Sequence, residues 1–479
     1  MGNPSRRDAL RTLAAGGLSL ALAGRVVGQA GERRRPNIVV LLADDLGWGD
    51  VGCYGCQDIK TPNLDAFAAQ GARFTNAYSS GPVCSPTRAG LLTGRYQQRF
   101  GFDANAEGQA APTDRGPRAL DIAQTTIAQR LKAAGYATGL VGKWHVGSEP
   151  GYLPNDRGFD ECYGYLPYGL AAKGPGGGPL PIYRGKQEVP APANHMEQFG
   201  REALAFIDRH REAPFFLYLA FSAVHGPMVG PEPWLSRYRE IPLLPRRKYA
   251  ADLSQLDDIV GQVMAKIAAL GLDEDTLVFF LGDNGGPGRP AYNGPLRGTK
   301  WTLWEGGIRV PFAVRWPGHI TAGQTLDQPV IQLDIVNTAL GVANAAVKPA
   351  DALDGVDLRP LLTGSAKAAP HDALYWRFGV QYAVRQGDWK LVKPHIDQQP
   401  HLFNLADDIG EATDLATKEP DRVKAMQALW DAWNQKNEAP RWIDRRWNGD
   451  GPGPAKPAPG PAKPAGKQNA NLARLDTDL

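Results

Sequence analysis

Polar side chains that could do chemistry directly follow four apolar, β-rich segments of this sequence. The segments are 38–43, 136–142, 214–221 and 276–281, and the residues after them are Asp44 with Asp45, Lys143 with His145, His225, and Asp283 with Asn284. Ligands bind outside the carboxyl ends of the strands in open parallel sheets, so we expect these side chains to meet in one site. Each group could also be a cap, a turn or a packed histidine, but four such coincidences are hard to accept.

Four of these residues, Asp44, Asp45, Asp283 and Asn284, offer oxygen ligands. Two adjacent carboxylates after a buried strand are costly unless a cation neutralises them. Oxygen ligands suit a hard divalent cation such as Ca²⁺ or Mg²⁺, and this set lacks the soft ligands that favour zinc. The sequence therefore predicts a site for a hard divalent cation, Ca²⁺ or Mg²⁺.

Cationic or proton-donating side chains complete the predicted site. They are Arg88, Lys143, His145, His225 and Lys300. Together with a metal ion, such groups would hold a small tetrahedral oxyanion and stabilise the charge that develops on it. The chemistry predicted from the residues is the transfer of a sulfuryl or phosphoryl group.

The segment Cys84-Ser85-Pro86-Thr87-Arg88 predicts a thiol at the start of a helix. Pro86 fits the first helical turn, and Gly94 fits the helix end. A sulfur at a helix N-terminus, with Arg88 one turn later, lies in a positive local field that suits a reactive thiolate or an anionic substrate. The alternative is a small buried cysteine that packs a loop.

The elements that must position these residues alternate along the chain. Continuous apolar strands are typical of a sheet buried on both faces, and helices are expected at 61–71, 126–134, 195–211 and 249–270. Residues 164–194 and 228–248 are predicted irregular inserts that shape the pocket. We expect an α/β fold with a mixed, mostly parallel central sheet flanked by helices.

The pattern changes around residue 370. Short alternating segments at 374–378, 381–385, 389–393 and 402–405, followed by a helix at 421–434, predict a small antiparallel sheet with a covering helix. From residue 449 onward the composition is typical of a disordered Pro/Ala/Gly/Lys tail. The predicted organisation is a catalytic α/β domain over 36–369, a C-terminal α+β subdomain over 370–448 and a tail over 449–479.

The N-terminus predicts an exported protein. Arg6 and Arg7 precede an apolar run over 13–23, and small residues continue toward Ala30, as in a twin-arginine signal peptide over 1–30; the alternative is a short surface helix. The run is too short to span a bilayer, which needs about 20 residues. We expect a protein exported by the twin-arginine machinery, periplasmic or secreted, without stable membrane insertion.

Net charge and cysteine content argue against a nucleic-acid-binding protein and against a disulfide-rich scaffold. The formal net charge of +3 over 479 residues, with no basic stripe, gives no case for nucleic-acid binding. Four cysteines are too few for a disulfide scaffold. Cys53 and Cys56 are interpreted as part of a structural loop, with a disulfide between them after export as an open possibility.

The segment from Cys84 to Arg88, followed by Leu91-Leu92-Thr93-Gly94-Arg95, is similar to the C-x-P-x-R signature of type I sulfatases, in the alkaline-phosphatase-like superfamily. The resemblance runs from Pro36 to Asp408. It implies that a maturation enzyme oxidises Cys84 to formylglycine, whose hydrate is both nucleophile and metal ligand. It also implies that Asp44, Asp45, Asp283 and Asn284 hold Ca²⁺ with residue 84.

The resemblance further implies a role for each cationic residue. Arg88 and Lys143 would orient the hydrate, and Lys143, His225 and Lys300 would bind the sulfate. His145 would take the proton from the spare hydroxyl, which expels sulfate and regenerates the aldehyde. His225, with Lys300, would stabilise or protonate the leaving alcohol oxygen. Modification before folding, and folding before export, would agree with the twin-arginine route.

The sequence departs from some arylsulfatases at Pro167-Tyr168-Gly169, where those enzymes have a serine after the tyrosine. The expected substrate is a sulfate ester, and export favours a sulfated carbohydrate. Three alternatives stay open: a phosphonate or phosphate monoester hydrolase of the same superfamily, a non-catalytic binder of sulfated glycans, and a thiol hydrolase that uses unmodified Cys84. The last is disfavoured because a thiolate is a soft partner for an all-oxygen metal site.

Overall fold

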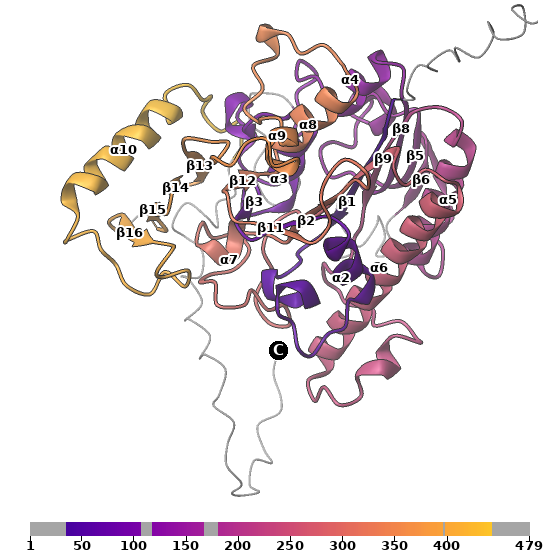
Figure 1. The fold of residues 1–479 in the computed structure, drawn as a ribbon, viewed down its shortest axis with the longest axis horizontal. Helices are drawn as coiled ribbons and strands as arrows, with labels where there is room; N and C mark the ends of the chain where they lie inside the picture. The colour runs from indigo at the N-terminus through magenta and orange to yellow at the C-terminus, as the bar shows by residue number, and fades with distance from the viewer. Residues whose placement is uncertain (1–34, 107–116, 167–180, 396–397, 443–479) are drawn as a thin grey trace, which may run out of the picture. The chain divides into compact units, whose positions relative to one another are not determined.

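The computed structural model describes residues 35–106, 117–166, 181–395 and 398–442. A ten-stranded sheet forms its centre, in the order β11-β2-β10-β9-β1-β8-β4-β5-β6-β7 (Figure 1). The five central strands run parallel: β9 (Thr276–Gly282), β1 (Asn37–Ala43), β8 (Phe215–Ala220), β4 (Ala137–Lys143) and β5 (Glu161–Tyr165). The expected mixed, mostly parallel sheet is therefore confirmed.

The outer strands account for the mixed character of the sheet. β10 (Phe312–Arg315) is antiparallel to both β9 and β2 (Ala72–Phe74), and β11 (Gln324–Leu326) is parallel to β2. At the other edge, β6 (Ile182–Arg184) and β7 (Gln187–Val189) form an antiparallel hairpin next to β5. The central strands keep their carboxyl ends at one edge of the sheet.

Helices cover both faces of the sheet, as Figure 1 shows. Alternate residues of β1 face opposite ways: Val39 packs in the cluster with α2, α5 and α6, and Val40 packs in the cluster with α3, α4 and α8. The helices are α2 (Pro62–Ala69), α3 (Cys84–Thr93), α4 (Ile127–Ala133), α5 (His195–His210), α6 (Leu244–Ala269) and α8 (Asp334–Val342). A strand with this burial has to be apolar at every position.

The helix expected at 249–270 begins earlier, at Leu244. Pro245 lies in its first turn, where a missing N–H costs no helical hydrogen bond. Part of the segment assigned to an irregular insert is therefore helical. The core face of this helix is made by Leu253, Leu256, Val260, Val263 and Ile267, which are all buried.

The C-terminal region forms the expected four-stranded antiparallel sheet. It comprises β13 (Leu374–Phe378), β14 (Gln381–Gln386), β15 (Trp389–Lys393) and β16 (His401–Asn404), with α10 (Pro420–Asn434) packed on β14 and β15. Trp376 of this sheet shares a hydrophobic cluster with Tyr78 and Leu303. The smaller elements are β3 (Ala77–Tyr78), which pairs with β12 (Val330–Ile331), and the short helices α7 (Glu305–Ile308) and α9 (Arg359–Leu362).

Some of the segments predicted from the sequence cannot be compared with the structure. The signal peptide over 1–30, the tail over 449–479 and the segment Pro167-Tyr168-Gly169 lie outside the described residues. Within the described part, none of the helices combines the length and the apolar character needed to cross a membrane.

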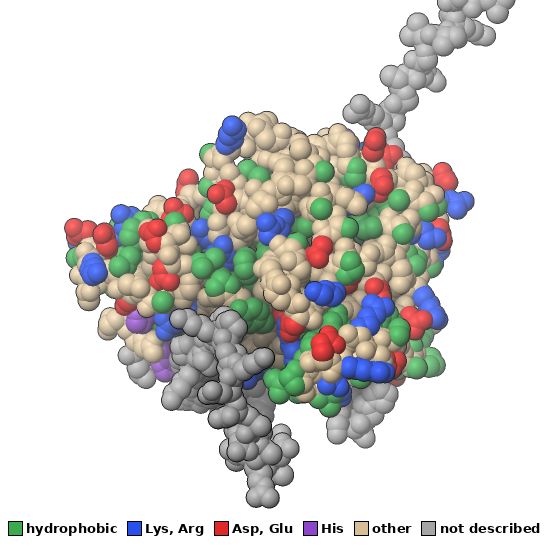
Figure 2. Space-filling model, turned by 60° about the horizontal axis from the view of Figure 1, so that its bottom comes forward, with side chains coloured by type: hydrophobic (Ala, Val, Ile, Leu, Met, Phe, Trp, Pro, Cys, Tyr) green, Lys and Arg blue, Asp and Glu red, His purple; other side chains and the backbone are tan. Residues whose placement is uncertain are grey.

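All four cysteines are free thiols, so the possible disulfide between Cys53 and Cys56 is not formed. Figure 2 shows acidic and basic side chains interspersed over one face.

Candidate active site

The residues predicted at the strand ends meet in one buried cluster. β9, β1, β8 and β4 are consecutive in the sheet, so the segments after them lie next to one another. Ligand atoms of Asp44, Asp45, Asp283 and Cys84 all lie within 4.8 Å of one another. All four residues are buried. This is the geometry of a candidate metal site.

Backbone contacts hold the acidic residues at these positions. The Asp44 N–H donates to the Ala223 carbonyl at 2.9 Å, and the Asp283 N–H donates to the Ala43 carbonyl at 2.9 Å. Asp45 has a left-handed φ of 61°, a conformation uncommon outside glycine. The chain therefore turns sharply directly after β1, and the Asp45 N–H donates to Asp283 Oδ1 at 3.1 Å.

Asn284 adds a side-chain amide to the cluster. Its Nδ2 donates to Asp45 Oδ1 at 2.8 Å and to the Gly285 carbonyl at 3.0 Å. Its Oδ1 is buried, and no hydrogen-bond partner for it lies among the described residues. A buried carbonyl oxygen without a donor is costly. Together with the neighbouring carboxylates, it fits a hard cation.

Cys84 begins α3 and is 1% exposed. Its Sγ lies 3.4 Å from Asp44 Oδ1 and 3.2 Å from Lys300 Nζ. Burial and the charge of Asp44 raise the pKa of this thiol above its ordinary value, although Lys143 and Lys300 oppose the shift. An unmodified Cys84 is therefore a protonated thiol, which argues against a thiolate nucleophile. The predicted helix start is confirmed, and Gly94 ends the helix at a φ of 68°.

Arg88 connects two of the strand ends. Its guanidinium donates to Asp283 Oδ2 from Nε at 3.2 Å and from Nη2 at 2.8 Å, and its Nη1 donates to the Lys143 carbonyl at 3.0 Å. Arg88 is completely buried. Burial opposes its charge, but Asp283 and Asp44 raise the pKa of the guanidinium above its ordinary value. Arg88 therefore keeps its charge in the interior.

Two lysines and a histidine reach the same carboxylates. Lys143 Nζ lies 2.5 Å from Asp44 Oδ2, and Lys300 Nζ lies 2.6 Å from Asp45 Oδ1. His225 Nε2 lies 3.6 Å from Asp45 Oδ2. The His225 side chain is 22% exposed, whereas both lysines are buried. His225 thus lies where this cluster meets solvent.

His145 lies in the cluster on a turn that follows β4, not on the strand itself. β4 ends at Lys143, and His145 has a left-handed φ of 64°, so the i, i+2 geometry of a strand does not apply. Burial, together with the charges of Lys143 and Arg88, lowers the pKa of His145 well below its usual value. The imidazole is therefore neutral and able to accept a proton.

Ser85 is a contributor that the sequence did not single out. Its Oγ donates to the His145 carbonyl at 2.6 Å and accepts from the Ala106 N–H at 3.2 Å. The residue after Cys84 therefore holds the backbone of His145 in its turned conformation. Only its place within the C-x-P-x-R segment pointed to Ser85 in the sequence. Its hydrogen-bond partner, the His145 carbonyl, is 60 residues away and could not be inferred.

The charges in the cluster nearly balance before any metal is added. Three carboxylates, Asp44, Asp45 and Asp283, face three permanent cations, Arg88, Lys143 and Lys300. Despite its burial, Asp44 has a pKa well below the usual value because of Lys143 and the other cations. Burial and the neighbouring Asp44 raise the pKa of Asp283 to about 7. A divalent cation would add positive charge and give the site a net attraction for anions.

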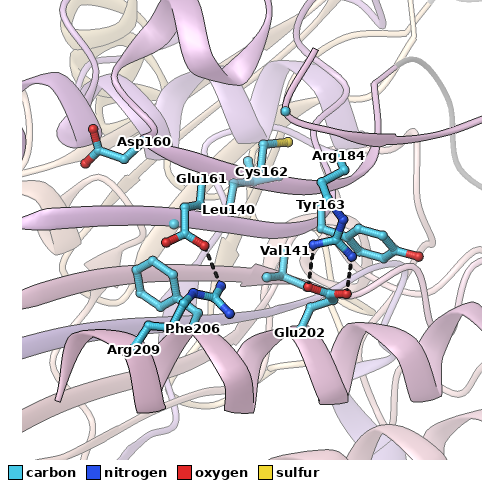
Figure 3. Close-up of a pocket in the computed structure, with 12 residues that line it drawn as sticks. Leu140, Val141, Asp160, Glu161, Cys162, Tyr163, Arg184, Glu202, Phe206 and Arg209 are labelled. Carbon is cyan, nitrogen blue, oxygen red and sulfur yellow. Dashed lines mark hydrogen bonds and ion pairs between the residues drawn. The ribbon is translucent and has the colours of Figure 1, made fainter. Parts of the chain in front are cut away.

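A second cavity, of about 310 Å³, lies between α5 and the strands β4 and β5 (Figure 3). Its charged side chains are already paired. Arg184 donates to both Glu202 oxygens, at 2.9 and 2.5 Å, and Arg209 donates to Glu161. Since these cations are engaged by carboxylates, the cavity offers no comparable anion site.

Sequence comparison finds similarity to sulfatases along nearly the whole of the described chain. Residues 36–345 match the sulfatase family, and residues 299–438 match the C-terminal part of N-sulphoglucosamine sulphohydrolase. Human N-acetylgalactosamine-6-sulfatase is 34% identical over 467 residues, which cover 86% of this chain and 88% of the relative. Human arylsulfatase A is 38% identical over 492 residues, which cover 90% of each chain.

Solved structures give the same result. The crystal structure of Ps i-CgsB has a TM-score of 0.80 and 32% identity, covering 86% of this chain and 95% of that chain. The phosphonate monoester hydrolase of Agrobacterium radiobacter shares the fold, with a TM-score of 0.63 and 22% identity over 84% of this chain and 96% of that chain. The alkaline-phosphatase-like fold is confirmed. This chain belongs to the sulfatase family and is an enzyme that hydrolyses sulfate esters.

Proposed function

We propose that the protein hydrolyses sulfate esters of a carbohydrate at the cluster around residue 84, with that residue as formylglycine and with bound Ca²⁺ or Mg²⁺. The observation that carries the proposal is the position of Cys84 Sγ, 3.4 Å from Asp44 Oδ1 and 3.2 Å from Lys300 Nζ. The names of two relatives support a carbohydrate: N-acetylgalactosamine-6-sulfatase, and Ps i-CgsB in complex with k-i-k-neocarrahexaose.

The donor set fits a hard metal ion. Asp44, Asp45, Asp283 and Asn284 would hold it through oxygen atoms, and residue 84 would complete the set through an oxygen of its hydrated aldehyde. When bound, the ion acts as a Lewis acid that neutralises charge on the reacting group. The structure supports an oxygen rather than a sulfur at residue 84, because the buried thiol stays protonated.

A hydrated aldehyde at residue 84 would supply an oxygen nucleophile and a second hydroxyl for release of sulfate. Cys84 Sγ marks where its oxygens would lie. Arg88 would hold Asp283 and the Lys143 carbonyl, and Lys143 would orient the hydrate from beside Asp44. The buried Arg88 is rigidly placed because three of its nitrogens are engaged.

The two lysines and the histidines suit the sulfate group and its proton transfers. Lys143, Lys300 and His225 would bind its oxygens, since their nitrogens face the carboxylates around residue 84. Neutral His145 would accept the proton of the second hydroxyl. His225, with Lys300, would stabilise or protonate the leaving alcohol oxygen, because His225 lies at the solvent side of the cluster.

We further propose a route to the working enzyme. A formylglycine-generating maturation enzyme would read the segment from Cys84 to Arg88, and the twin-arginine machinery would then export the folded product to the periplasm or beyond. In this structure the segment is fully buried within α3. A modifying enzyme must therefore reach it before folding, and the twin-arginine route accepts folded cargo.

Mass spectrometry of the tryptic peptide that contains residue 84 tests the proposal. We expect the mass of an aldehyde in place of the thiol. Cys84→Ala should abolish sulfate release from an aryl sulfate, whereas Cys162→Ala, a change at a buried cysteine beside the second cavity, should retain it.

Turnover of Cys84→Ala at the wild-type rate would refute the mechanism. Paired aryl sulfate and aryl phosphate substrates separate the two reaction classes. We expect a higher kcat/KM for the sulfate, and a clear preference for the phosphate would favour the monoester hydrolase instead.

A further inference from the structure

We infer that Gln381, at the start of β14 in the C-terminal sheet, is a positioning residue that sets Lys300 for sulfate binding; this rests on the proposed role of Lys300. The Gln381 side chain makes two hydrogen bonds with the segment after Lys300. Its Nε2 donates to the Trp301 carbonyl at 2.9 Å, and its Oε1 accepts from the Leu303 N–H at 3.2 Å. Gln381 is buried, so both bonds are made away from water.

The segment that carries Lys300 needs external support. Trp301 has a φ of 70°, a left-handed conformation that is unfavourable for a bulky residue. The Trp301 N–H donates to the Pro82 carbonyl at 2.9 Å, and the Lys300 N–H donates to the Gly286 carbonyl at 3.0 Å. These two bonds fix one side of the turn, and Gln381 fixes the other.

Glu411, in the segment between β16 and α10, holds both ends of the same loop. At its start, Arg297 Nη1 donates to the Glu411 carbonyl at 2.9 Å. At its end, the Glu305 N–H donates to Glu411 Oε2 at 2.7 Å. Among the hydrogen bonds between this loop and the C-terminal region, the two made by Gln381 lie nearest to Lys300 along the chain. The loop is thus anchored at its ends by Glu411 and shaped in its middle by Gln381.

Gln381 of the C-terminal sheet should therefore affect how tightly the site binds sulfate. Lys300 Nζ reaches Asp45 at 2.6 Å and Cys84 Sγ at 3.2 Å, so a shift of its backbone moves the ammonium away from where sulfate would bind. Gln381 does not contact these groups in any hydrogen bond of the structure's described part. Its effect must therefore pass through Trp301 and Leu303 to Lys300.

The test replaces the amide by an apolar side chain of similar length. Gln381→Met should raise the dissociation constant of inorganic sulfate, measured by calorimetry, and the KM for an aryl sulfate by about tenfold, as expected for losing buried hydrogen bonds. The fraction of residue 84 that is converted, measured by mass spectrometry, should not change. Gln386→Met, at the exposed end of the same strand, is the matched control and should leave sulfate affinity unchanged.

A double-mutant cycle separates positioning from general damage. In a Lys300→Ala background, Gln381→Met should produce little further loss of sulfate affinity, because the residue that it positions is absent. The inference is overturned if Gln381→Met weakens sulfate binding in the Lys300→Ala background as much as it does in the wild-type protein. It is also overturned if a folded Gln381→Met protein keeps wild-type sulfate affinity while Lys300→Ala weakens it.

Two further outcomes are decisive. If Lys300→Ala leaves sulfate affinity unchanged, the proposed role of Lys300 fails, and the inference fails with it. If Gln381→Met does not fold, Gln381→Glu replaces it, since a carboxylate accepts from the Leu303 N–H but cannot donate to the Trp301 carbonyl. That variant should also weaken sulfate binding, and wild-type affinity would overturn the inference.

Discussion

Two buried histidines have opposite pKa shifts, and their neighbours explain the difference. Burial lowers the pKa of His145 well below its usual value, and the charges of Lys143 and Arg88 lower it further. Burial also opposes the charge of His371, but Asp334 more than compensates and raises its pKa. Neutral His145 suits the proposed proton acceptor, whereas His371, whose charged form Asp334 favours, suits a structural ion pair.

His371 gives a pH prediction at the scale of a single residue. Its Nε2 lies 2.8 Å from Asp334 Oδ1, and Asp334 is completely buried. Because the folded pKa is raised, this pair stabilises the protein fully below the unfolded pKa of about 6.5 and loses that contribution as pH rises through the folded pKa. The free energy of unfolding should therefore separate wild type from His371→Gln more at about pH 5.5 than at about pH 8.5.

Denaturant unfolding at the two pH values measures this difference, and titrating groups that do not interact with His371 cancel in the comparison. A His210→Gln variant, at a half-buried histidine that pairs with Glu161, is a control for the loss of a more exposed ion pair. A gap between wild type and His371→Gln that widens toward alkaline pH would contradict the assignment.

At the scale of elements, β1 and β9 are parallel neighbours, and the acidic residues that follow them are separated by no other strand. A cation bound there stabilises the folded state by about 2.7 kcal/mol at one hundred times its dissociation constant. Ca²⁺ should therefore raise the Tm of chelator-treated protein. Asp283→Asn should abolish most of that shift, and Asp407→Asn, an exposed change, should preserve it.

Differential scanning calorimetry with and without Ca²⁺ measures both shifts, and Mg²⁺ in place of Ca²⁺ compares the two ions directly. The same Ca²⁺-dependent rise in Asp283→Asn as in wild type would place the ion elsewhere.

The strand ends could be predicted because a strand buried on both faces is apolar throughout and stops where polar residues begin. The acids after β1 and β9 were found in this way. The turn at His145 was not, because its left-handed backbone depends on Ser85 Oγ, a contact made across the fold. The order of β10, β2 and β11 was also beyond the sequence, since edge pairing depends on partners far away in the chain. The same holds for Gln381, which lies 80 residues from Trp301.

At the scale of the whole molecule, a buried group of charges joins the C-terminal sheet to α7. Lys390 of β15 lies 2.8 Å from Glu305 Oε1 and 2.9 Å from Glu411 Oε1, and all three side chains are completely buried. Despite burial, Lys390 lowers the pKa of Glu305 to about 2, whereas burial raises the pKa of Glu411 to about 7. Glu305 also accepts from Tyr78 at 2.7 Å. Lys390, with Arg309 beside Glu305, thus balances two acids where the C-terminal sheet meets α7.

Lys390→Met should therefore destabilise the protein by about 3–5 kcal/mol, because it leaves Glu411 buried without its cation and removes one of the cations next to Glu305. Adding Glu411→Gln should recover part of this loss, since the second change removes one of those carboxylates while Glu305 keeps its ion pair with Arg309 at 3.1 Å. Urea unfolding at neutral pH measures both values, and Lys436→Met provides an exposed control. If the double variant is less stable than Lys390→Met, packing rather than charge balance holds the C-terminal sheet against α7 at this point.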